Sequence, residues 1–348
     1  MSVAATDVVA LAIEHTKAQL FRSFRFSQWW RLALVGFLAG ELGSSSSFNF
    51  NIPTNTRHEQ SHFLGAAWPP SLHHPGAQTV AFVGVCLALA LVLVVVSVYI
   101  GSVMRFILFD SVIAKECHIR RGWRRRRSEG ASLFRWQISY LAISLVATFL
   151  VIGAPVAYAW AHGWFSHARD HVARLVLGGI ALLLVFFVLF AVITVISVLT
   201  KDFVVPQMAL EGLTAVEGWR RLLNWMRAEK GHFAGYVGLK IVLDLAAVFL
   251  VAIVQILALL VMLIPAGAIA LVIYYEAKAA AWTWNPPAIA LAVILGAIAL
   301  LLIFSTLVLI ATPVAVFFPA YSIYFFAPRY PLLAALLRPQ PPSPAGSG

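Results

Sequence analysis

Charged residues and cysteines are scarce in this chain, and each shortage excludes a class of protein. Only 11% of the residues are Asp, Glu, Lys or Arg, whereas soluble domains carry about 25%. Hydrophobic residues make up 61% of the chain and the mean hydropathy is +0.88, which excludes a soluble globular domain and places most of the chain in lipid. Two cysteines, Cys86 and Cys117, provide no disulfide framework.

Sequence motifs for nucleotide chemistry are also missing. The sequence contains no P-loop, no dinucleotide fingerprint and no buried pair of carboxylates. We therefore expect no enzyme and no cofactor. The net charge of +11 does not indicate nucleic acid, because the basic residues lie in blocks between apolar runs, which is the pattern that sets membrane topology.

Long apolar runs predict the fold class, an all-α polytopic helical membrane protein. A spanning helix needs about 20 apolar residues, and only the first predicted span is shorter. The six predicted spans are residues 29–42, 79–104, 136–160, 172–197, 236–265 and 288–312. Together they predict one transmembrane domain over residues 1–330, with an outer loop at 43–78 and a disordered, proline-rich cytoplasmic tail at 331–348.

The distribution of basic residues predicts the orientation. With a cytoplasmic N-terminus, 21 of the 25 lysines and arginines lie on the inner side, and only Arg57, Arg169, Arg174 and Lys278 lie outside. This asymmetry predicts that both termini are cytoplasmic. Two acidic residues, Glu41 and Glu276, then fall near the outer boundary and are expected to be solvated.

Both ends of the transmembrane region carry special features. The N-terminal segment is predicted to be an amphipathic helix at the interface, with Val9, Ile13, Leu20 and Phe21 on its apolar side. The last two apolar stretches run for about 40 residues, twice the length that crosses the hydrocarbon core. Prolines in IPAG (264–267) and TPVAVFFPAY (312–321) are expected to kink or end these helices.

A repeated motif predicts internal symmetry. The motif Gly-Trp-Arg-Arg occurs at Gly122 and again at Gly218, 96 residues later. The same offset aligns Arg105 with Lys201 and overlays successive spans. Because both copies start on the same side of the membrane, we predict a parallel repeat with units of about 79–160 and 175–265.

Each predicted repeat unit places a basic, tryptophan-containing connector on the cytoplasmic face. Such connectors suit anionic phospholipids, to which each basic residue near the surface contributes about 1 kcal/mol. The alternative is that the arginines only set the topology. The predicted headgroup-binding residues are Arg120, Arg121, Trp123, Arg124, Arg125, Arg126, Arg127, Trp219, Arg220 and Arg221.

These connectors also carry a family resemblance. DFVVPQMALEGLTAVEGWRRLLNWMRAEKGHFAGYVGLKIVLDL (Asp202 to Leu245) resembles the connector of bacterial membrane proteins related to the membrane domain of glycerophosphoryl diester phosphodiesterase. A valine–proline step, a glutamate–glycine pair, a tryptophan–arginine helix and a glycine–aromatic entry into the next span carry the likeness. The earlier copy, FILFDSVIAKECHIRRGWRRRR, is similar but lacks the proline. The likeness in pattern covers about residues 10–330.

The resemblance implies a multi-pass helical domain of the bacterial inner membrane whose activity is largely unknown. In some members this domain is fused to a soluble barrel that hydrolyses phosphodiesters. Outside the predicted spans there is no room for a barrel of about 250 residues. The resemblance therefore implies no phosphodiesterase activity and no catalytic residue.

Histidines on the predicted outer face form the one pattern that suggests a metal. His58 to His62 matches H-E-x-x-H, the zinc-protease motif, but it lies in a stretch rich in Asn, Pro, Ser and Gly where a helix is not expected. His167 and His171 repeat the four-residue spacing. Zinc, copper or nickel would suit such pairs, whereas histidines of solvated loops need no role.

A last candidate lies inside a predicted span, where Lys240 and Asp244 are one helical turn apart and are expected to pair. We predict a non-enzymatic inner-membrane module that engages anionic lipid or a cytoplasmic protein through its connectors, with a possible homo-oligomer. One alternative is a small-solute or lipid transporter, which would need Lys240 and Asp244 to face a cavity. The other is a metal site, which would need the outer histidines to converge.

Overall fold

The computed structural model describes residues 5–22, 24–41, 77–165, 171–279 and 286–337, and within these ranges the regular structure is helical, without a strand. This confirms the predicted all-α fold class. The elements are α1 (Ala5–Lys17), the π-helical η1 (Ala18–Arg22), α2 (Phe26–Leu38), α4 (Ala77–Ala114), α5 (Ile119–Ala161), α6 (Val172–Leu199), the π-helical η2 (Thr200–Val204), α7 (Val205–Glu211), α8 (Ala215–Ala228), α9 (Lys230–Ala279), α10 (Pro286–Phe326), the 3₁₀-helical η3 (Ala327–Arg329) and α11 (Pro331–Leu337).

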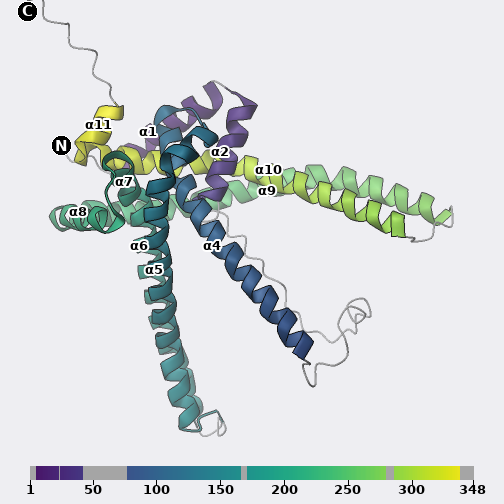
Figure 1. The fold of residues 1–348 in the computed structure, drawn as a ribbon, viewed down its shortest axis with the longest axis horizontal. Coiled ribbons are helices and arrows are strands. Elements are labelled where there is room, and N and C mark those ends of the chain that lie inside the picture. The colour runs from purple at the N-terminus through teal and green to yellow at the C-terminus, as the bar shows by residue number, and fades with distance from the viewer. Residues whose placement is uncertain (1–4, 23, 42–76, 166–170, 280–285, 338–348) are drawn as a thin grey trace, which may run out of the picture.

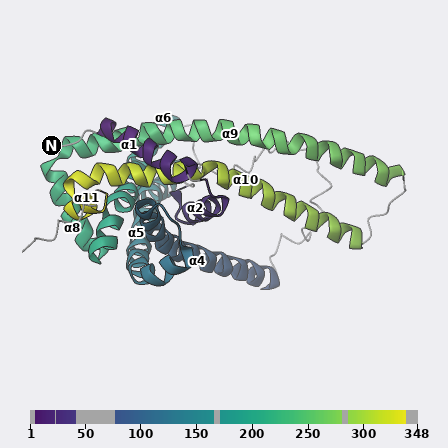
Figure 2. The ribbon, with the colours of Figure 1, turned by 90° about the horizontal axis from the view of Figure 1, so that it is seen from above.

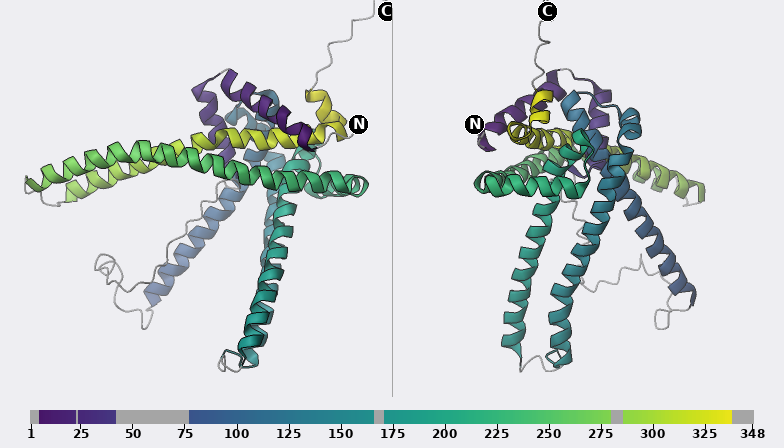
Figure 3. Two further views of the ribbon diagram at one scale, coloured as in Figure 1. Left: turned by 180° about the vertical axis from the view of Figure 1, so that it is seen from behind. Right: turned by 60° about the vertical axis from the view of Figure 1, so that its left-hand side comes forward.

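The helices form one packed hub from which three apolar arms extend (Figure 1). The hub consists of α1, η1, α2, η2, α7, α8 and α11 with the adjoining ends of α4, α5, α9 and α10. One arm is α4 alone. The second is the pair α9 and α10, which run side by side (Figure 2), and the third is the pair α5 and α6, which leaves the hub in a different direction (Figure 3).

Aromatic side chains from three segments form the core of the hub. Phe203 of η2, Tyr236 of α9, and Tyr321, Phe325 and Phe326 of α10 are all fully buried. Tyr236 stacks on Tyr321 with ring centroids 5.1 Å apart and planes 7° apart. Large rings bury much apolar area, so this cluster holds the inner ends of η2, α9 and α10 together.

Five helices are long and apolar enough to cross a membrane, one fewer than the sequence predicts, counted over the described ranges. The difference is the first predicted span. There α2 has only 13 residues, about 20 Å at 1.5 Å per residue, against a hydrocarbon core of about 30 Å. It packs in the hub against α4 and α10, and Gly36 comes so close to α10 that a Cβ there would lie 2.6 Å from the Cβ of Ala315.

The prolines of the two longest helices do not end them, contrary to one of the expected outcomes. α9 is a single helix of 50 residues around Pro265, and α10 is a single helix of 41 residues around Pro313 and Pro319. Neighbouring helices make this possible, because they can compensate for the one missing backbone hydrogen bond. The inner part of each helix belongs to the hub, so only the outer part needs to span a bilayer.

The two ends of the described chain also differ in detail from the prediction. α1 buries Val8, Ala12 and, just beyond it, Leu20, whereas the predicted apolar residues Ile13 and Phe21 are exposed. α1 therefore packs on α10 rather than presenting that face to lipid. At the other end α11 covers the start of the predicted disordered tail and buries Leu333, so the tail does not begin at residue 331.

Candidate functional site

The arginine run begins at the turn between α4 and α5. α4 stops at Ala114, Lys115 adopts a left-handed conformation with φ of 56°, and α5 begins at Ile119. Five arginines near the start of α5 are exposed, and within the described chain they have no hydrogen bond or ion pair. They are Arg120, Arg121, Arg124, Arg125 and Arg127, and we call them the α5 arginines.

Arg126 belongs to the same run but is buried and fully engaged. Its Nε and one Nη each donate to a carboxylate oxygen of Asp110 at 2.8 Å, and its other Nη donates to the carbonyl of Ala209 at 2.7 Å. Glu129 lies 3.4 Å away. Arg126 therefore joins α4, α5 and α7, and this removes it from the predicted headgroup-binding set.

The second connector, α8, begins with a capping box in which Thr214 and Glu217 satisfy each other's backbone N–H groups. Its buried face consists of Ala215, Gly218 and Leu222. The opposite faces of α8 differ sharply in exposure. This fixes which of its arginines can reach a membrane surface.

The exposed stripe of α8 combines apolar and basic residues. At 100° per residue, four side chains fall within about 60° of one another around α8: Val216, Arg220, Leu223 and Arg227. The two apolar ones, Val216 and Leu223, are 55% and 43% exposed. Arg221 points elsewhere and donates to Glu211 at 2.6 Å. Of the two predicted α8 arginines, only Arg220 remains outside an ion pair within the described part of the chain.

The two predicted tryptophans anchor their connectors to the hub. The indole N–H of Trp219 donates to the hydroxyl of Thr200 at 3.1 Å. Trp123 packs edge-on against Tyr99 with centroids 6.1 Å apart. Both side chains are half-buried, and the N–H of Trp219 already has a partner, so these residues position the arginines.

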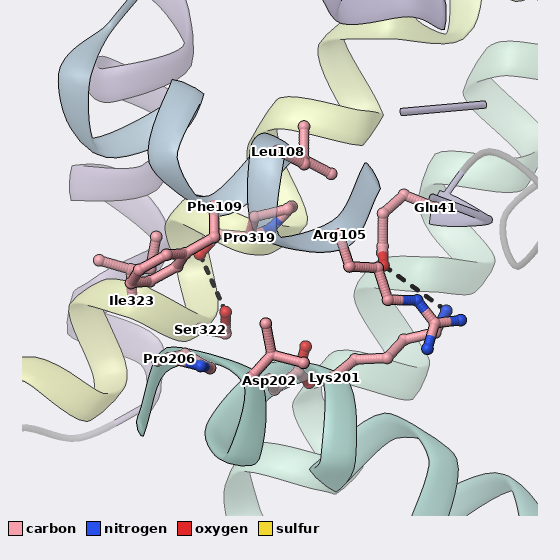
Figure 4. Close-up of a pocket in the computed structure, with 11 residues that line it drawn as sticks. Glu41, Arg105, Leu108, Phe109, Lys201, Asp202, Pro206, Pro319, Ser322 and Ile323 are labelled. Atoms are coloured by element: carbon pink, nitrogen blue, oxygen red, sulfur yellow. Dashed lines mark hydrogen bonds and ion pairs between the residues drawn. The ribbon is translucent and has the colours of Figure 1, made fainter. Parts of the chain in front are cut away.

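A second polar site lies inside the hub, where charged side chains of the segment after α2, of α4 and of η2 meet (Figure 4). Lys201 of η2 lies 3.6 Å from the carboxylate of Glu41, which follows α2. Arg105 of α4 donates its Nε to the carbonyl of Ala39 at 3.0 Å. Glu41, predicted to be solvated, is 9% exposed, because the short α2 ends in the hub instead of crossing the membrane.

Asp202 of η2 is the acceptor at the centre of this buried cluster. One of its carboxylate oxygens accepts from Lys240 at 2.5 Å and from the hydroxyl of Tyr236 at 2.9 Å. No ion pair joins Lys240 to Asp244 in the described structure, although the two are a turn apart. The partner of Lys240 therefore comes from a different helix than the sequence predicts.

The charged groups of the cluster surround a small cavity. It has room of about 30 Å³ for water-sized molecules, enough for one or two waters. Asp202, Arg105, Lys201 and Glu41 reach its wall. The other lining residues are Leu108, Phe109, Val205, Pro206, Pro319, Ser322 and Ile323.

The electrostatics of the cluster favour the ionised form of Glu41. Burial by itself would raise the pKa of the Glu41 carboxyl, but the nearby cations of Lys201, Lys240 and Arg105 hold that pKa below its usual value. Glu41 is therefore a carboxylate at neutral pH. Its charge offsets part of the positive charge around the cavity.

The predicted histidine site falls largely outside the described ranges, which do not include His58, His62 or His167. His171 directly precedes α6, and its ring centroid lies 6.1 Å from that of Trp164. The described residues contain no group of three or more possible metal ligands. The metal site stays a prediction.

Comparison with known proteins places the chain in a family. A model of a family of unknown function, DUF7544, matches residues 3–336. The chain belongs to the DUF7544 family. No curated protein and no solved structure matches it. The DUF7544 match neither supports nor opposes the resemblance to the phosphodiesterase membrane domain, which stays a prediction.

Sequence reasoning identified the exposed arginines of this DUF7544 protein but missed most of the buried cluster. In the sequence, Arg105 and Lys201 are related only by the 96-residue offset, and no pattern singles out Asp202. One available signal was that charged residues at the ends of apolar runs face each other when the runs pack together. The packing partner, however, is set by the tertiary fold.

Proposed function

We propose that this protein is a membrane module that holds anionic phospholipid headgroups with the α5 arginines and with Arg220 and Arg227 of α8. The observation that carries the proposal is the division of the arginine run. Five of its members project without a partner in the described chain, while Arg126 alone is used to build the hub. Unpaired, exposed arginines beside apolar residues have the composition of an interfacial surface that attracts anionic lipid.

The stripe on α8 supports this proposal. Val216 and Leu223 can enter the interfacial region, while Arg220 and Arg227 beside them reach the phosphates. A guanidinium presents several N–H donors in a plane and suits phosphate oxygens. Arg221 of the same helix is held in an ion pair with Glu211, so we expect it to take no part in headgroup binding.

The proposal requires that the hub lie on the cytoplasmic side of the membrane. The hub carries both connectors, and the outer tips of the arms carry Arg174 near the start of α6 and Lys278 near the end of α9. This distribution is the one expected when the hub faces the cytoplasm. Insertion into one planar bilayer also requires the arms, which leave the hub in different directions (Figure 3), to turn about it.

The internal repeat is part of the same proposal, since it would explain why there are two connectors. The connector helices α5 and α8 begin at Ile119 and Ala215, separated by the offset of 96 residues found in the sequence. A Cβ on Gly122 would lie 3.0 Å from Ile107, and one on Gly218 would lie 2.9 Å from Val204. In each connector this glycine allows close approach to an earlier segment, α4 for Gly122 and η2 for Gly218.

Native mass spectrometry of the protein released into mild detergent tests the proposal. We expect the wild type to retain phosphatidylglycerol, and a variant with the α5 arginines changed to glutamine to lose most of it. A matched variant, Arg174→Gln with Lys278→Gln, removes positive charge at the arm tips and is expected to retain the lipid. Equal retention by all three proteins would overturn the proposal.

The α8 stripe is tested separately. Arg220→Gln with Arg227→Gln is expected to lower the number of bound phosphatidylglycerol molecules, whereas Arg221→Gln is expected to leave that number unchanged. If Arg221→Gln lowered lipid retention as much as the double variant, the loss would follow from total charge. The assignment of the stripe would then be wrong.

A further inference from the structure

We propose that the exposed face of α2 lies among the acyl chains of the leaflet nearest the hub and thereby anchors the hub in the membrane. This surface takes lipid tails, whereas the α5 arginines and the α8 stripe take headgroups. The inference requires that the arms span a bilayer, but it does not depend on headgroup binding. Four large apolar side chains form the surface, and we call them the α2 face: Phe26, Trp30, Leu34 and Phe37.

Helical periodicity places the α2 face on one side of a short helix. At 100° per residue its four side chains fall within about 80° of one another, and they are between 36% and 63% exposed. The opposite side, which includes Leu32 and Val35, is fully buried in the hub. With 13 residues, α2 is about 20 Å long and too short to cross a hydrocarbon core of about 30 Å. Its apolar face therefore belongs to the leaflet beside the hub.

The α2 face is continuous with the surface of an arm. The ring of Phe37 meets the ring of Phe304 of α10 edge-on, with centroids 5.2 Å apart. Phe304 is 42% exposed and lies in the apolar stretch of α10 that is long enough to cross a membrane. Lipid that covers Phe304 therefore reaches Phe37, and the other members of the α2 face continue from there along one side of α2.

A hydrogen bond fixes α2 to this same arm. Pro313 of α10 has no N–H and cannot donate to the carbonyl of Leu309, four residues earlier. The indole N–H of Trp29 donates to that carbonyl instead, at 3.0 Å. A carbonyl of a lipid-crossing helix is thereby satisfied, as the membrane interior requires. The bond also fixes α2 at the base of the arm, so its exposed face moves with α10.

The apolar surface extends beyond α2 into the segment before it. Phe21, in η1, and Phe24 pack against the ring of Trp29 with centroids 5.3 and 5.4 Å apart. They are nevertheless 57% and 62% exposed. Contiguous apolar surface of this kind is rarely left in water and marks a contact with a membrane or a protein. The continuity with α10 identifies lipid as the cover.

Basic side chains lie beside this apolar surface. Arg22, Arg25 and Arg31 are exposed, and α2 contains no acidic residue. Arg22 lies 4.0 Å from Glu14, and Arg31 donates to the carbonyl of Cys117 at 3.5 Å. Arginine stems can follow an apolar surface while the guanidinium reaches the phosphates. Aromatic residues bordered by arginines have the composition of a helix inserted at the membrane interface.

Electron paramagnetic resonance of spin-labelled protein tests the inference. Cys86→Ala and Cys117→Ala remove the native thiols, and the protein is reconstituted in phosphatidylcholine vesicles, which carry no net charge. Labels are attached to Phe26→Cys, Trp30→Cys or Leu34→Cys. We expect each label to be more accessible to oxygen, which partitions into lipid, than to the water-soluble nickel–EDDA complex.

Two further labels calibrate the measurement. Leu91→Cys replaces a side chain that is 65% exposed on the α4 arm and reports the response of lipid. Leu336→Cys replaces a side chain that is 49% exposed on α11, at the other end of the hub (Figure 1), and is expected to prefer the nickel complex. The matched pair compares two exposed apolar positions of the hub, one beside an arm and one remote from it.

Two outcomes would overturn the inference. If the labels on the α2 face prefer the nickel complex as the Leu336→Cys label does, the face lies in water. If these labels show spin–spin broadening that dilution with unlabelled protein removes, a second copy of the chain covers the face in place of lipid.

A measurement on the wild type decides the question if the cysteine-free protein does not fold. Phosphatidylcholine with a diazirine in its acyl chain is cross-linked by light, and the adducts are located by mass spectrometry after trypsin digestion. We expect adducts on the peptide FSQWWR, residues 26–31. Labelling of the α4 arm without labelling of this peptide would overturn the inference. The variant lacking the α5 arginines is expected to keep these adducts, so loss of headgroup binding and loss of tail contact can be told apart.

Discussion

Asp110 of α4 and Arg126 of α5 form a two-point ion pair, in which both carboxylate oxygens lie 2.8 Å from guanidinium nitrogens. The side chain of Arg126 is 6% exposed and that of Asp110 is 31% exposed. The same guanidinium donates to the carbonyl of Ala209 in α7. One arginine of the run thus fixes how α4, α5 and α7 meet, while its neighbours in sequence remain free to meet a membrane surface.

The first prediction concerns stability. Arg126→Gln is expected to lower the free energy of unfolding by about 2–4 kcal/mol, because it leaves a partly buried carboxylate without its partner. Arg125→Gln should change it by less than about 0.5 kcal/mol. Thermal unfolding of both variants in one detergent provides the comparison, and equal stabilities would show that Arg126 has no special structural role.

A second prediction concerns the contact between α4 and α5. A Cβ on Gly130 would lie 2.5 Å from Cγ2 of Val103 and 3.0 Å from its Cα. Gly130→Ala should therefore push the two helices apart and cost about 1–3 kcal/mol of stability. Gly231→Ala, whose Cβ would meet no atom within 4 Å, should leave the Tm unchanged or slightly higher. A stable Gly130→Ala protein would mean that the helices are packed more loosely.

The apolar runs made the all-α class and five of the six predicted spans predictable, because length and hydrophobicity alone decide whether a helix can cross lipid. The position of α2 was not predictable in this way. Its 13-residue helix is apolar enough to suggest a short span, and only its packing against α4 and α10 shows that it belongs to the hub. Glu41, predicted to be solvated at the end of that span, is instead buried in the hub and forms an ion pair with Lys201.

The candidate sites show the same division between local and tertiary information. The arginine run was visible in the sequence, but four consecutive arginines look alike until Asp110 selects one of them. Lys240 and Asp244 looked like partners because they are neighbours on one helix. Asp202 lies 38 positions earlier than Lys240, and only the packing of η2 against α9 brings the two together.

A third prediction follows from this exchange of partners. Asp202→Asn should leave the ammonium of Lys240 buried without a carboxylate and lower stability by about 3–5 kcal/mol. Asp244→Asn removes a carboxylate without an ion pair in the described structure and should cost less than about 1 kcal/mol. A double variant, Asp202→Asn with Lys240→Met, should be less destabilised than the sum of its two single variants. Equal losses for Asp202→Asn and Asp244→Asn would favour the pairing expected from sequence.

The fourth prediction concerns pH and arises from His15, which ties α1 to α4 and α10. Its Nε2 lies 3.0 Å from the carbonyl of Val112 and must donate, so in the neutral ring Nδ1 accepts from the hydroxyl of Tyr324 at 3.1 Å. Burial and then the positive charge of Lys115 lower the pKa of His15 below its ordinary value of 6.5.

Because the folded state binds the proton of His15 more weakly than the unfolded state, neutral His15 stabilises the fold fully above pH 6.5. That contribution is lost as the pH falls below 6.5 toward the lower folded pKa. The Tm of the wild type should therefore decline between pH 7.5 and 5. His15→Gln, which cannot titrate, should show a shallower decline, whereas His118→Gln, which changes an exposed histidine, should follow the wild type. Identical slopes for His15→Gln and the wild type would mean that another group causes the decline.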